Sequence, residues 1–469
     1  MKLFKPTVGP IVGYTTENEA RIWFRGDLES DGDTYRRCFG VVQWNQKGKP
    51  GSEKKIKLTK LSPNFDMTGV FPLTELKANT EYEYKAAWFS GDMELEAAES
   101  ISQFDWDKVD TWTLKTSTAQ KTSARSYIVG SCRYLLRVFG LSIFDDRGDK
   151  AFRSILAQHQ TNPVHGILMV GDQIYADDLN FLAPDKSLEN FFKRYRVAFT
   201  QEHIQKLMAQ IPTYMILDDH EIEDNWPAKA DSKDMTTLYP SAIHAYQVYQ
   251  CSHSPVFSLD SDGWISGTPK HLWYNFSDGC ADWFVMDVRT ERIWSEDASK
   301  RQMIKKHQMD ALLKWLSDGS GRAKMIVTSV PFIPDLESDS DDKWGAFLPE
   351  RTKILNYIFE QKIRKVSFVS GDVHCSFTAQ LTCPDDPEFK VFTIISSSFF
   401  WPYPHMEEGD FVLKGKLASN ENRNYVVGSA SKLYSDDNFA RLDIDKDGIT
   451  VTYFERKGEK LGRAVRLAF

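Results

Sequence analysis

Residues 166–178, GILMVGDQIYADD, decide the fold class of this chain. The stretch begins as a short apolar run, typical of a strand buried on both faces, and continues directly into a polar loop. Residues 127–133 (YIVGSCR) and 211–221 (IPTYMILDDHE) repeat the pattern. Helical stretches at residues 151–160 and 187–210 lie between them. Apolar strands that alternate with helices predict an α/β core.

The same alternation continues toward the C-terminus. Strands are predicted at residues 283–287, 325–330, 366–370 and 391–396, with helices at 303–316 and 351–361. The tail, residues 439–469, reads as strands again. Its DIDKDG segment could begin a calcium loop, but the twelfth position from Asp443 is Phe454 rather than Glu, so a hairpin turn at Asp447–Gly448 is predicted instead.

The first ~115 residues have the pattern of an all-β region. Short segments at 20–25, 38–44 and 54–59 mix β-branched and aromatic residues with polar ones. Residues 73–87, LTELKANTEYEYKAA, resemble a strand region of immunoglobulin- and fibronectin-like sandwiches, with Tyr82 or Tyr84 as a tyrosine corner. A generic antiparallel hairpin is the alternative.

A polar stretch without apolar periodicity, residues 115–126, reads as a linker. We therefore predict a β-sandwich domain over residues 1–120. A catalytic domain is predicted over residues 121–469, with a sheet core flanked by helices and strands at its C-terminal end.

Composition excludes several classes of protein. The chain has 469 residues, of which 41% are hydrophobic, enough for a sizeable core in more than one structural unit. The net charge of −8 disfavours a nucleic-acid-binding protein, although a phosphodiester could still be a substrate because metal cations can reverse the sign of an acidic pocket. The six cysteines form no CxxC pair and predict no disulfide framework.

The N-terminus, MKLFKPTVGPIVGYTT, has no apolar run long enough for a signal peptide, and no other stretch approaches a membrane-spanning length. A cytoplasmic protein that does not bind membranes is therefore expected. The oligomeric state cannot be derived from these patterns.

Four polar segments follow apolar strands and carry the chemistry. They are GSCR at 130–133, GDQIY at 171–175, DDHE at 218–221 with Asp224 and Asn225 close behind, and GDVH at 371–374. So many carboxylates at one sheet edge would repel one another and raise each other's pKa. Bound metal cations are the usual resolution. One Gly-Asp alone is equally compatible with a helix N-cap.

The spacing within two of these segments suits a pair of metals. In Asp372-x-His374, two ligands on the same side of an extended chain can reach adjacent ions. Asp172 can bridge the ions through its two oxygens. Two metals about 3.5–4 Å apart generate a hydroxide nucleophile and stabilise charge on a transferring phosphoryl group.

The order of Cys132, GDxxY, DDHE and GDVH resembles the PhoD-like alkaline phosphatases and phosphodiesterases, within the metallophosphoesterase superfamily. The resemblance covers most of the chain. Supporting segments are RYR at 194–196, MDVR at 286–289, and Asp342, Trp344 and Gly345. More distant members supply a further histidine that residues 327–331 lack, which fits the PhoD-like branch and disfavours a dinuclear zinc or manganese site.

The resemblance implies a set of metal ligands. Cys132, Asp172, Tyr175 as phenolate, and His374 would hold Fe³⁺. Asp172 would bridge to a Ca²⁺ site shared with Asp372 and one of Asp219, Asp224 and Asn225, a choice that the sequence leaves open. Other divalent metals are compatible with the oxygen ligands.

Three residues have implied catalytic roles, each with an alternative. His220 would be an acid or phosphate-orienting group, or with Asp219 part of a structural ion pair or cap. Arg133 and Arg289 would bind phosphate, or form salt bridges. Cys132 and Tyr175, outside this motif order, would be a buried thiol and a core aromatic. Cys375, one residue past His374, is expected to point away from it and be inert.

The predicted function is hydrolysis of small-molecule phosphate monoesters or diesters by a metal-bound hydroxide. The alternative is a catalytically inactive ligand-binding protein that retains the fold. A third reading is a metal-dependent hydrolase that acts on another bond.

Overall fold

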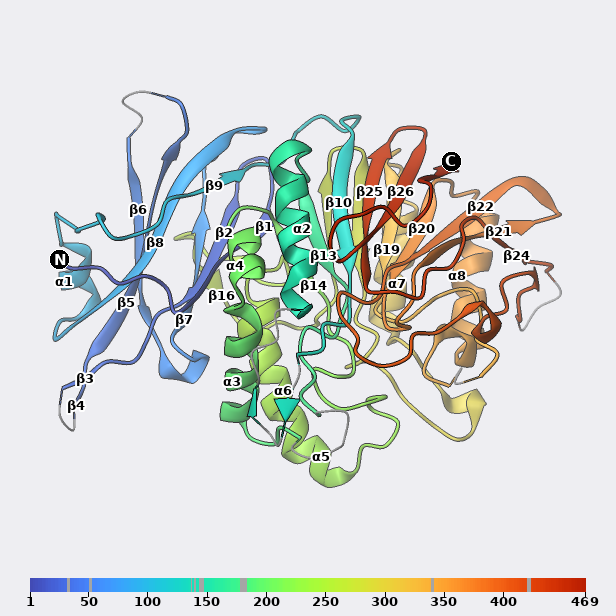
Figure 1. Ribbon diagram of the computed structural model, residues 1–469, viewed down its shortest axis with the longest axis horizontal. Helices are drawn as coiled ribbons and strands as arrows, with labels where there is room; N and C mark the ends of the chain where they lie inside the picture. Colours follow the sequence, from blue (N-terminus) through green and yellow to red (C-terminus); the bar gives the residue numbers. More distant parts are fainter. Residues whose placement is uncertain are drawn as a thin grey trace.

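The computed structural model describes residues 1–31, 34–49, 53–135, 137–138, 141–142, 147–177, 184–338, 341–419 and 423–469. Two facing β-sheets form the centre of the region after residue 124 (Figure 1). The six-stranded sheet has the order β14 (Thr213–Met215), β13 (Gly166–Met169), β10 (Arg125–Gly130), β25 (Asn438–Asp445), β26 (Gly448–Glu455) and β27 (Val465–Ala468). The eight-stranded sheet has the order β17 (Tyr274–Asp278), β18 (Ala281–Val285), β19 (Ala323–Val327), β20 (Val366–Ser370), β22 (Asp386–Ile395), β21 (Phe377–Cys383), β24 (Val426–Ser429) and β23 (Gly415–Lys416).

Alternating side chains of the strands form separate cores on the two faces of each sheet. In β10, Tyr127 and Val129 pack between the sheets, against Trp283 of β18, whereas Ile128 faces the helices. The helices on that side are α2 (Arg147–Thr161), α3 (Leu188–Phe199), α4 (Glu202–Met208) and α6 (Leu238–Tyr246), with α5 (Ser232–Thr236) before α6. Helices α7 (Lys306–Leu316) and α8 (Leu348–Glu360) pack on the eight-stranded sheet. These layers confirm the predicted α/β core.

Parallel strands bring their carboxyl ends to one edge of each sheet. Strands β10, β13 and β14 are mutually parallel, and β18, β19, β20 and β22 form a second parallel set. The polar segments that follow β10, β13, β14 and β20 are those singled out in the sequence. The topology therefore explains how residues far apart along the chain can meet.

The N-terminal region, at the left of Figure 1, is a pair of antiparallel sheets. One has the order β1 (Val8–Thr15), β2 (Ala20–Arg25) and β7 (Thr68–Leu73), and the other β6 (Lys55–Leu61), β5 (Arg37–Gln46), β8 (Glu81–Gly91) and β9 (Trp112–Lys115). The short strands β3 (Ser30–Asp31) and β4 (Thr34–Tyr35) and the helix α1 (Leu95–Glu99) complete it. The Tyr82 hydroxyl accepts a hydrogen bond from the backbone of Lys77 at 2.9 Å.

The remaining short elements are the pairs β11 (Arg137–Val138) with β12 (Leu141–Ser142) and β15 (Ser258–Leu259) with β16 (Ile265–Ser266), and a π-helical turn at Gln247–Cys251. The predicted C-terminal hairpin is present, but its turn residues are Lys446 and Asp447, one position earlier than predicted, because Gly448 already pairs with Asp445. The Asp445 side chain accepts hydrogen bonds from the backbone of Asp447 and Gly448, which closes the turn. No helix among the described ranges combines the length and apolar character needed to cross a bilayer.

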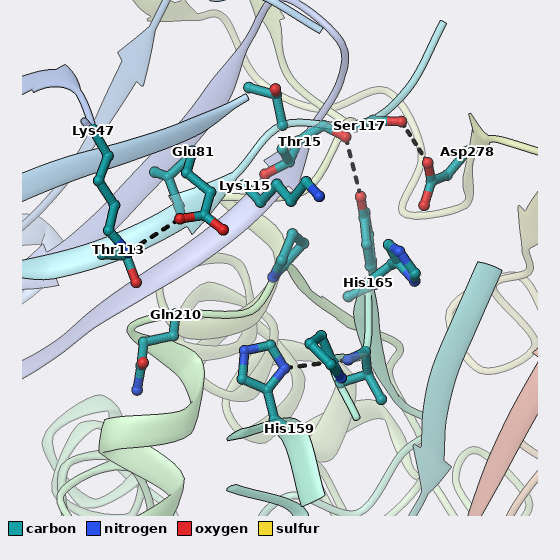
Figure 2. Close-up of a pocket in the computed structure, with 16 residues that line it drawn as sticks. Thr15, Lys47, Glu81, Thr113, Lys115, Ser117, His159, His165, Gln210 and Asp278 are labelled. Carbon is teal, nitrogen blue, oxygen red and sulfur yellow. Dashed lines mark hydrogen bonds and ion pairs between the residues drawn. The ribbon is translucent and has the colours of Figure 1, made fainter. Parts of the chain in front are cut away.

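The N-terminal sheets are joined to the helical layer by buried contacts. The Trp23 indole donates to the Val248 carbonyl at 2.8 Å, and the Tyr84 hydroxyl donates to the Ala209 carbonyl at 2.7 Å. A cavity of about 190 Å³ lies at this junction, lined from one side by Thr15 and Lys115 and from the other by His159 and His165 (Figure 2). Burial lowers the pKa of both histidines, that of His165 to about 4, so both are neutral at pH 7.

His253 makes the same junction sensitive to pH. The ring is 0% exposed, and burial lowers its pKa to about 4. In the unfolded chain the His253 ring binds a proton near pH 6.5, whereas in the folded chain it does so only near pH 4. The contribution to stability is therefore complete above pH 6.5 and is lost as the pH falls toward 4.

We expect His253→Gln to remove up to about 3 kcal/mol of this pH dependence of unfolding. Denaturant unfolding of both proteins at several pH values between 4 and 8 measures the difference. As the pH falls, the free energy of unfolding of His253→Gln should decrease less than that of wild type. A difference that does not change with pH would show that His253 does not titrate differently in the two states.

Candidate metal centre

Tight turns at the strand ends aim the candidate ligands at one space. Cys132, Asp172, Asp372 and His374 have positive φ angles of 56°, 55°, 71° and 50°. Such conformations are uncommon for these residue types and gather at functional sites. Asp372 and His374 thus lie in a turn, not in the extended chain expected from their spacing. Gly171 precedes Asp172 with φ 103°, and a Cβ there would meet the Asp218 Cβ at 2.5 Å.

Sulfur, carboxylate and phenol groups meet around Asp172. Its Oδ2 lies 3.3 Å from the Cys132 Sγ and 3.4 Å from the Tyr175 hydroxyl. All three side chains are buried, and burial raises the pKa of each one well above its usual value. Asp172 Oδ1 is buried without a hydrogen-bond partner among the described residues. An uncompensated group of acids like this favours a bound cation.

His374 reaches this group through Ser397 and Trp401. The Ser397 hydroxyl lies 3.2 Å from the Cys132 Sγ and accepts from the His374 backbone at 3.0 Å. The Trp401 ring stacks on the His374 ring with centroids 3.8 Å apart and lies 5.7 Å from the Tyr175 ring. His374 Nε2 is buried and has no partner within the described ranges, and burial holds the pKa of this imidazole well below its usual value. A neutral imidazole with a free nitrogen is suited to bind a metal.

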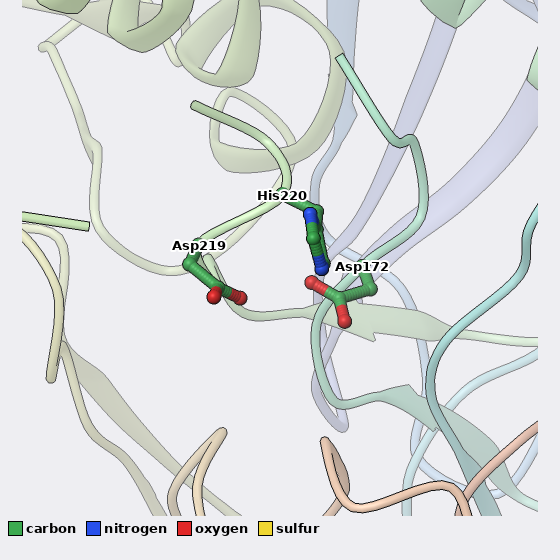
Figure 3. A group of neighbouring side chains, drawn as sticks. All are labelled: Asp172, Asp219 and His220. Carbon is green, nitrogen blue, oxygen red and sulfur yellow. The ribbon is translucent and has the colours of Figure 1, made fainter. Parts of the chain in front are cut away.

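Asp219 and His220 close the other side of the space. Ligand atoms of Asp172, Asp219 and His220 all lie within 4.8 Å of one another, and Figure 3 shows one ring nitrogen of His220 pointing toward the Asp172 carboxylate. Asp177 holds the His220 Nδ1 at 2.9 Å. Burial alone would lower the pKa of His220, but Asp219, Asp177 and Asp172 outweigh it and raise the pKa well above its usual value.

A second group of carboxylates consists of Asp218, Asp219 and Asp372, again within 4.8 Å. Burial raises the pKa of Asp218 to about 7 and that of Asp372 to about 6, whereas the pKa of Asp219 is lowered because Arg289 and His220 outweigh its burial. Two cationic side chains contact this group. Lys343 Nζ lies 2.6 Å from Asp372 Oδ2, and Arg289 Nε lies 2.5 Å from Asp218 Oδ1.

Arg289 lies among the carboxylates. Its guanidinium is 0% exposed and also contacts Asp342 at 2.6 Å and Asp219 at 3.4 Å. These contacts hold the carboxylates in place, as a positioning residue would. The phosphate-binding role expected of Arg289 stays a prediction.

Arg133 and Asp224 do not face the centre. Arg133 is buried, donates to the Ala198 carbonyl at 2.8 Å and packs over Phe152, because in the turn after β10 its side chain faces the helical layer. Asp224 is 35% exposed and lies 3.6 Å from the Lys229 ammonium. These contacts do not support the phosphate-binding role expected of Arg133 or the ligand role of Asp224, and both roles stay predictions. Cys375 is buried in a separate apolar cluster, away from His374.

Of the three residues proposed for the second site, the structure favours Asp219. The Asn225 backbone donates to Asp219 Oδ2 at 2.7 Å and Asn225 has a positive φ of 59°, which places it beside the site, so it stays a candidate next to Asp219. Glu221, not singled out in the sequence, accepts from the backbone of Asp172, Gln173 and Asp218 at 3.1, 2.7 and 3.0 Å. It therefore organises two of the loops. Its place in DDHE was the available signal. Lys343 lies within the supporting segment of Asp342, Trp344 and Gly345, but no role was predicted for it.

Comparison with known proteins shows the family of the chain. The family model for PhoD-like phosphatases matches residues 143–452, more than half of the chain. The chain belongs to this family. Alkaline phosphatase D of Bacillus subtilis (strain 168) is 24% identical over 218 residues, which are 42% of this chain and span only 36% of that relative. The PhoD-like fold extends further: a solved structure of PhoD superposes with a TM-score of 0.71 at 14% identity, covering 97% of this chain and 92% of the other.

Proposed function

We propose that this PhoD-like protein hydrolyses phosphate monoesters or diesters at a metal centre built by Cys132, Asp172, Tyr175 and His374. The observation that carries the proposal is the meeting of thiol, carboxylate and phenol within 3.4 Å in a buried space. Membership in a phosphatase family supports the reaction class.

The residues fit Fe³⁺ at the first group. Ionisation of the Cys132 thiol and the Tyr175 phenol is unfavourable in the buried protein, and a trivalent cation would favour both anions. Asp172 Oδ1 and His374 Nε2 supply two further donors that are otherwise unsatisfied. When bound, such a centre supplies an activated water and neutralises charge on the phosphate oxygens.

The second group fits a hard cation such as Ca²⁺, which takes carboxylate oxygens. Asp219 and Asp372 would hold it, with Asp172 shared between the two positions. Lys343 and Arg289 would remain next to these carboxylates and keep their oxygens in place.

His220 is the proton donor in this proposal. Asp177 fixes one ring nitrogen, and the other faces the space between Asp172 and Asp219. Asp177, which is not assigned to a metal, would stabilise the protonated ring, so the ring could pass a proton to the departing alkoxide.

We also propose that residues 1–120 form an immunoglobulin- or fibronectin-like domain that supports a catalytic domain over residues 121–469. The paired antiparallel sheets and the hydrogen bond from the Lys77 backbone to the Tyr82 hydroxyl support this reading. The segment between β9 and β10 is the boundary.

Hydrolysis of p-nitrophenyl phosphate and bis-p-nitrophenyl phosphate tests the proposal, with iron and calcium supplied and after chelation. We expect turnover that chelation abolishes and metal restores. Metal binding without turnover of either compound would favour a binding protein. Carboxylic esters and amides are assayed beside these two compounds. Turnover confined to the carboxylic esters or amides would point to hydrolysis of another bond.

A further inference from the structure

A second cavity lies beside the candidate metal centre. It has a volume of about 350 Å³, and its lining includes Asn225, Lys229, Arg292, Trp294 and Asp342. Asp342 also contacts Arg289, whose guanidinium reaches Asp218 and Asp219. The cavity and the two acidic groups therefore share a wall.

Arg292 presents an unsatisfied donor at this cavity. The residue is 7% exposed, its Nε donates to the Val288 carbonyl at 2.9 Å, and its Nη1 contacts Asp342. Its Nη2 is buried and has no hydrogen-bond partner in the described parts of the chain. A buried charged donor without a partner costs free energy, so the position favours an anionic acceptor.

Several cationic side chains meet along this wall. Asp342 is shared by Arg289, Arg292 and Lys343. Arg289 also contacts Asp218 and Asp219, and Lys343 also contacts Asp372, whereas Arg292 has Asp342 as its carboxylate partner among the described residues. The other lining carboxylate, Asp341, is bound at 3.0 Å by Arg301, which stacks on Trp294 at 3.8 Å. Lys229 adds a cation at the rim, with 70% of its side chain exposed and its ammonium 3.6 Å from Asp224.

We propose that this cavity binds a second phosphate group of the substrate, so that the preferred substrates are phosphate esters that carry two phosphates. The inference rests on the proposed function, because it assigns a substrate class to the same site. Arg292 Nη2 and the Lys229 ammonium hold the second phosphate while the first is hydrolysed at the metal centre.

Two nucleotide esters with the same leaving group test this. They are the p-nitrophenyl ester of thymidine 5′-phosphate and the same compound with an added 3′-phosphate. We expect the added phosphate to lower KM about tenfold, in line with one or two charge-assisted hydrogen bonds. Lys229→Ala and Arg292→Lys should each raise KM for the 3′-phosphorylated ester alone. Lys5→Ala, an exposed and ion-paired lysine of the N-terminal sheets, is the matched control.

Equal KM values for the two esters in wild type, or an equal rise in both with Lys229→Ala, would overturn the inference and leave the proposed function intact. Calorimetric measurement of the binding of thymidine 3′,5′-bisphosphate and thymidine 5′-phosphate separates phosphate binding in the cavity from the proposed hydrolysis. Tighter binding of the bisphosphate that depends on Lys229, with neither ester hydrolysed, would support phosphate binding in the cavity and contradict the proposed reaction. Equal affinities for the two nucleotides would contradict phosphate binding in the cavity, whether or not turnover occurs.

Discussion

Asp172→Asn is expected to lower kcat/KM for p-nitrophenyl phosphate by about 10³-fold or more, equivalent to about 4 kcal/mol of transition-state stabilisation. Asp172 lies within hydrogen-bonding distance of both Cys132 and Tyr175 and belongs to the group with Asp219 and His220. An amide keeps the shape but removes the negative charge that a bridging ligand needs. Steady-state kinetics with iron and calcium supplied measure the loss.

The fold should survive this substitution. Burial already raises the pKa of Asp172, so in the metal-free protein a neutral side chain is readily accommodated. Asp443→Asn, a change of the same type on β25 where the carboxylate pairs with Arg441, is the control and should keep full activity. If Asp172→Asn retained more than a tenth of wild-type activity, the bridging role would be wrong.

Arg289→Ala is expected to destabilise the metal-free protein by about 3–5 kcal/mol, because it leaves buried carboxylates uncompensated. The guanidinium contacts Asp218, Asp219 and Asp342 with no exposure to solvent. The loss should be smaller at pH 5 than at pH 8, since Asp218, whose pKa is about 7, can then take up a proton. Urea unfolding after chelation measures both values.

Arg301→Ala provides the comparison. Arg301 is also largely buried, but its partner Asp341 is 69% exposed, so we expect a loss of about 1 kcal/mol from the exposed pair and the stacking on Trp294. Similar losses for the two variants would show that the carboxylates around Arg289 are stabilised by something else, such as retained cations.

The sequence predicted the α/β core because the strands of a parallel sheet are buried on both faces and appear as apolar runs. Polar residues at the ends of β10, β13, β14 and β20 then had to share an edge. The order of the motifs then indicated which of these residues act together. Extended geometry at Asp372 and His374 was expected from their spacing, but spacing does not report the left-handed φ angles that the turn adopts.

Side-chain direction within a turn was the least predictable feature. Arg133 follows Cys132 directly, yet the Cys132 thiol lies against Asp172 whereas the Arg133 guanidinium donates to the Ala198 carbonyl in the helical layer. Lys343 reaches Asp372 from a segment that carried no ligand pattern of its own. Such contacts depend on how separate loops pack, which periodicity and local propensity do not describe.

The visible absorption spectrum of the iron-loaded protein tests the metal centre most directly. Tyr175 as a phenolate ligand should give a broad charge-transfer band and a purple or brown colour. Tyr175→Phe should keep the iron, held by Cys132, Asp172 and His374, but lose the band. A wild-type protein that retains no iron, or a band that persists in Tyr175→Phe, would contradict the centre described here.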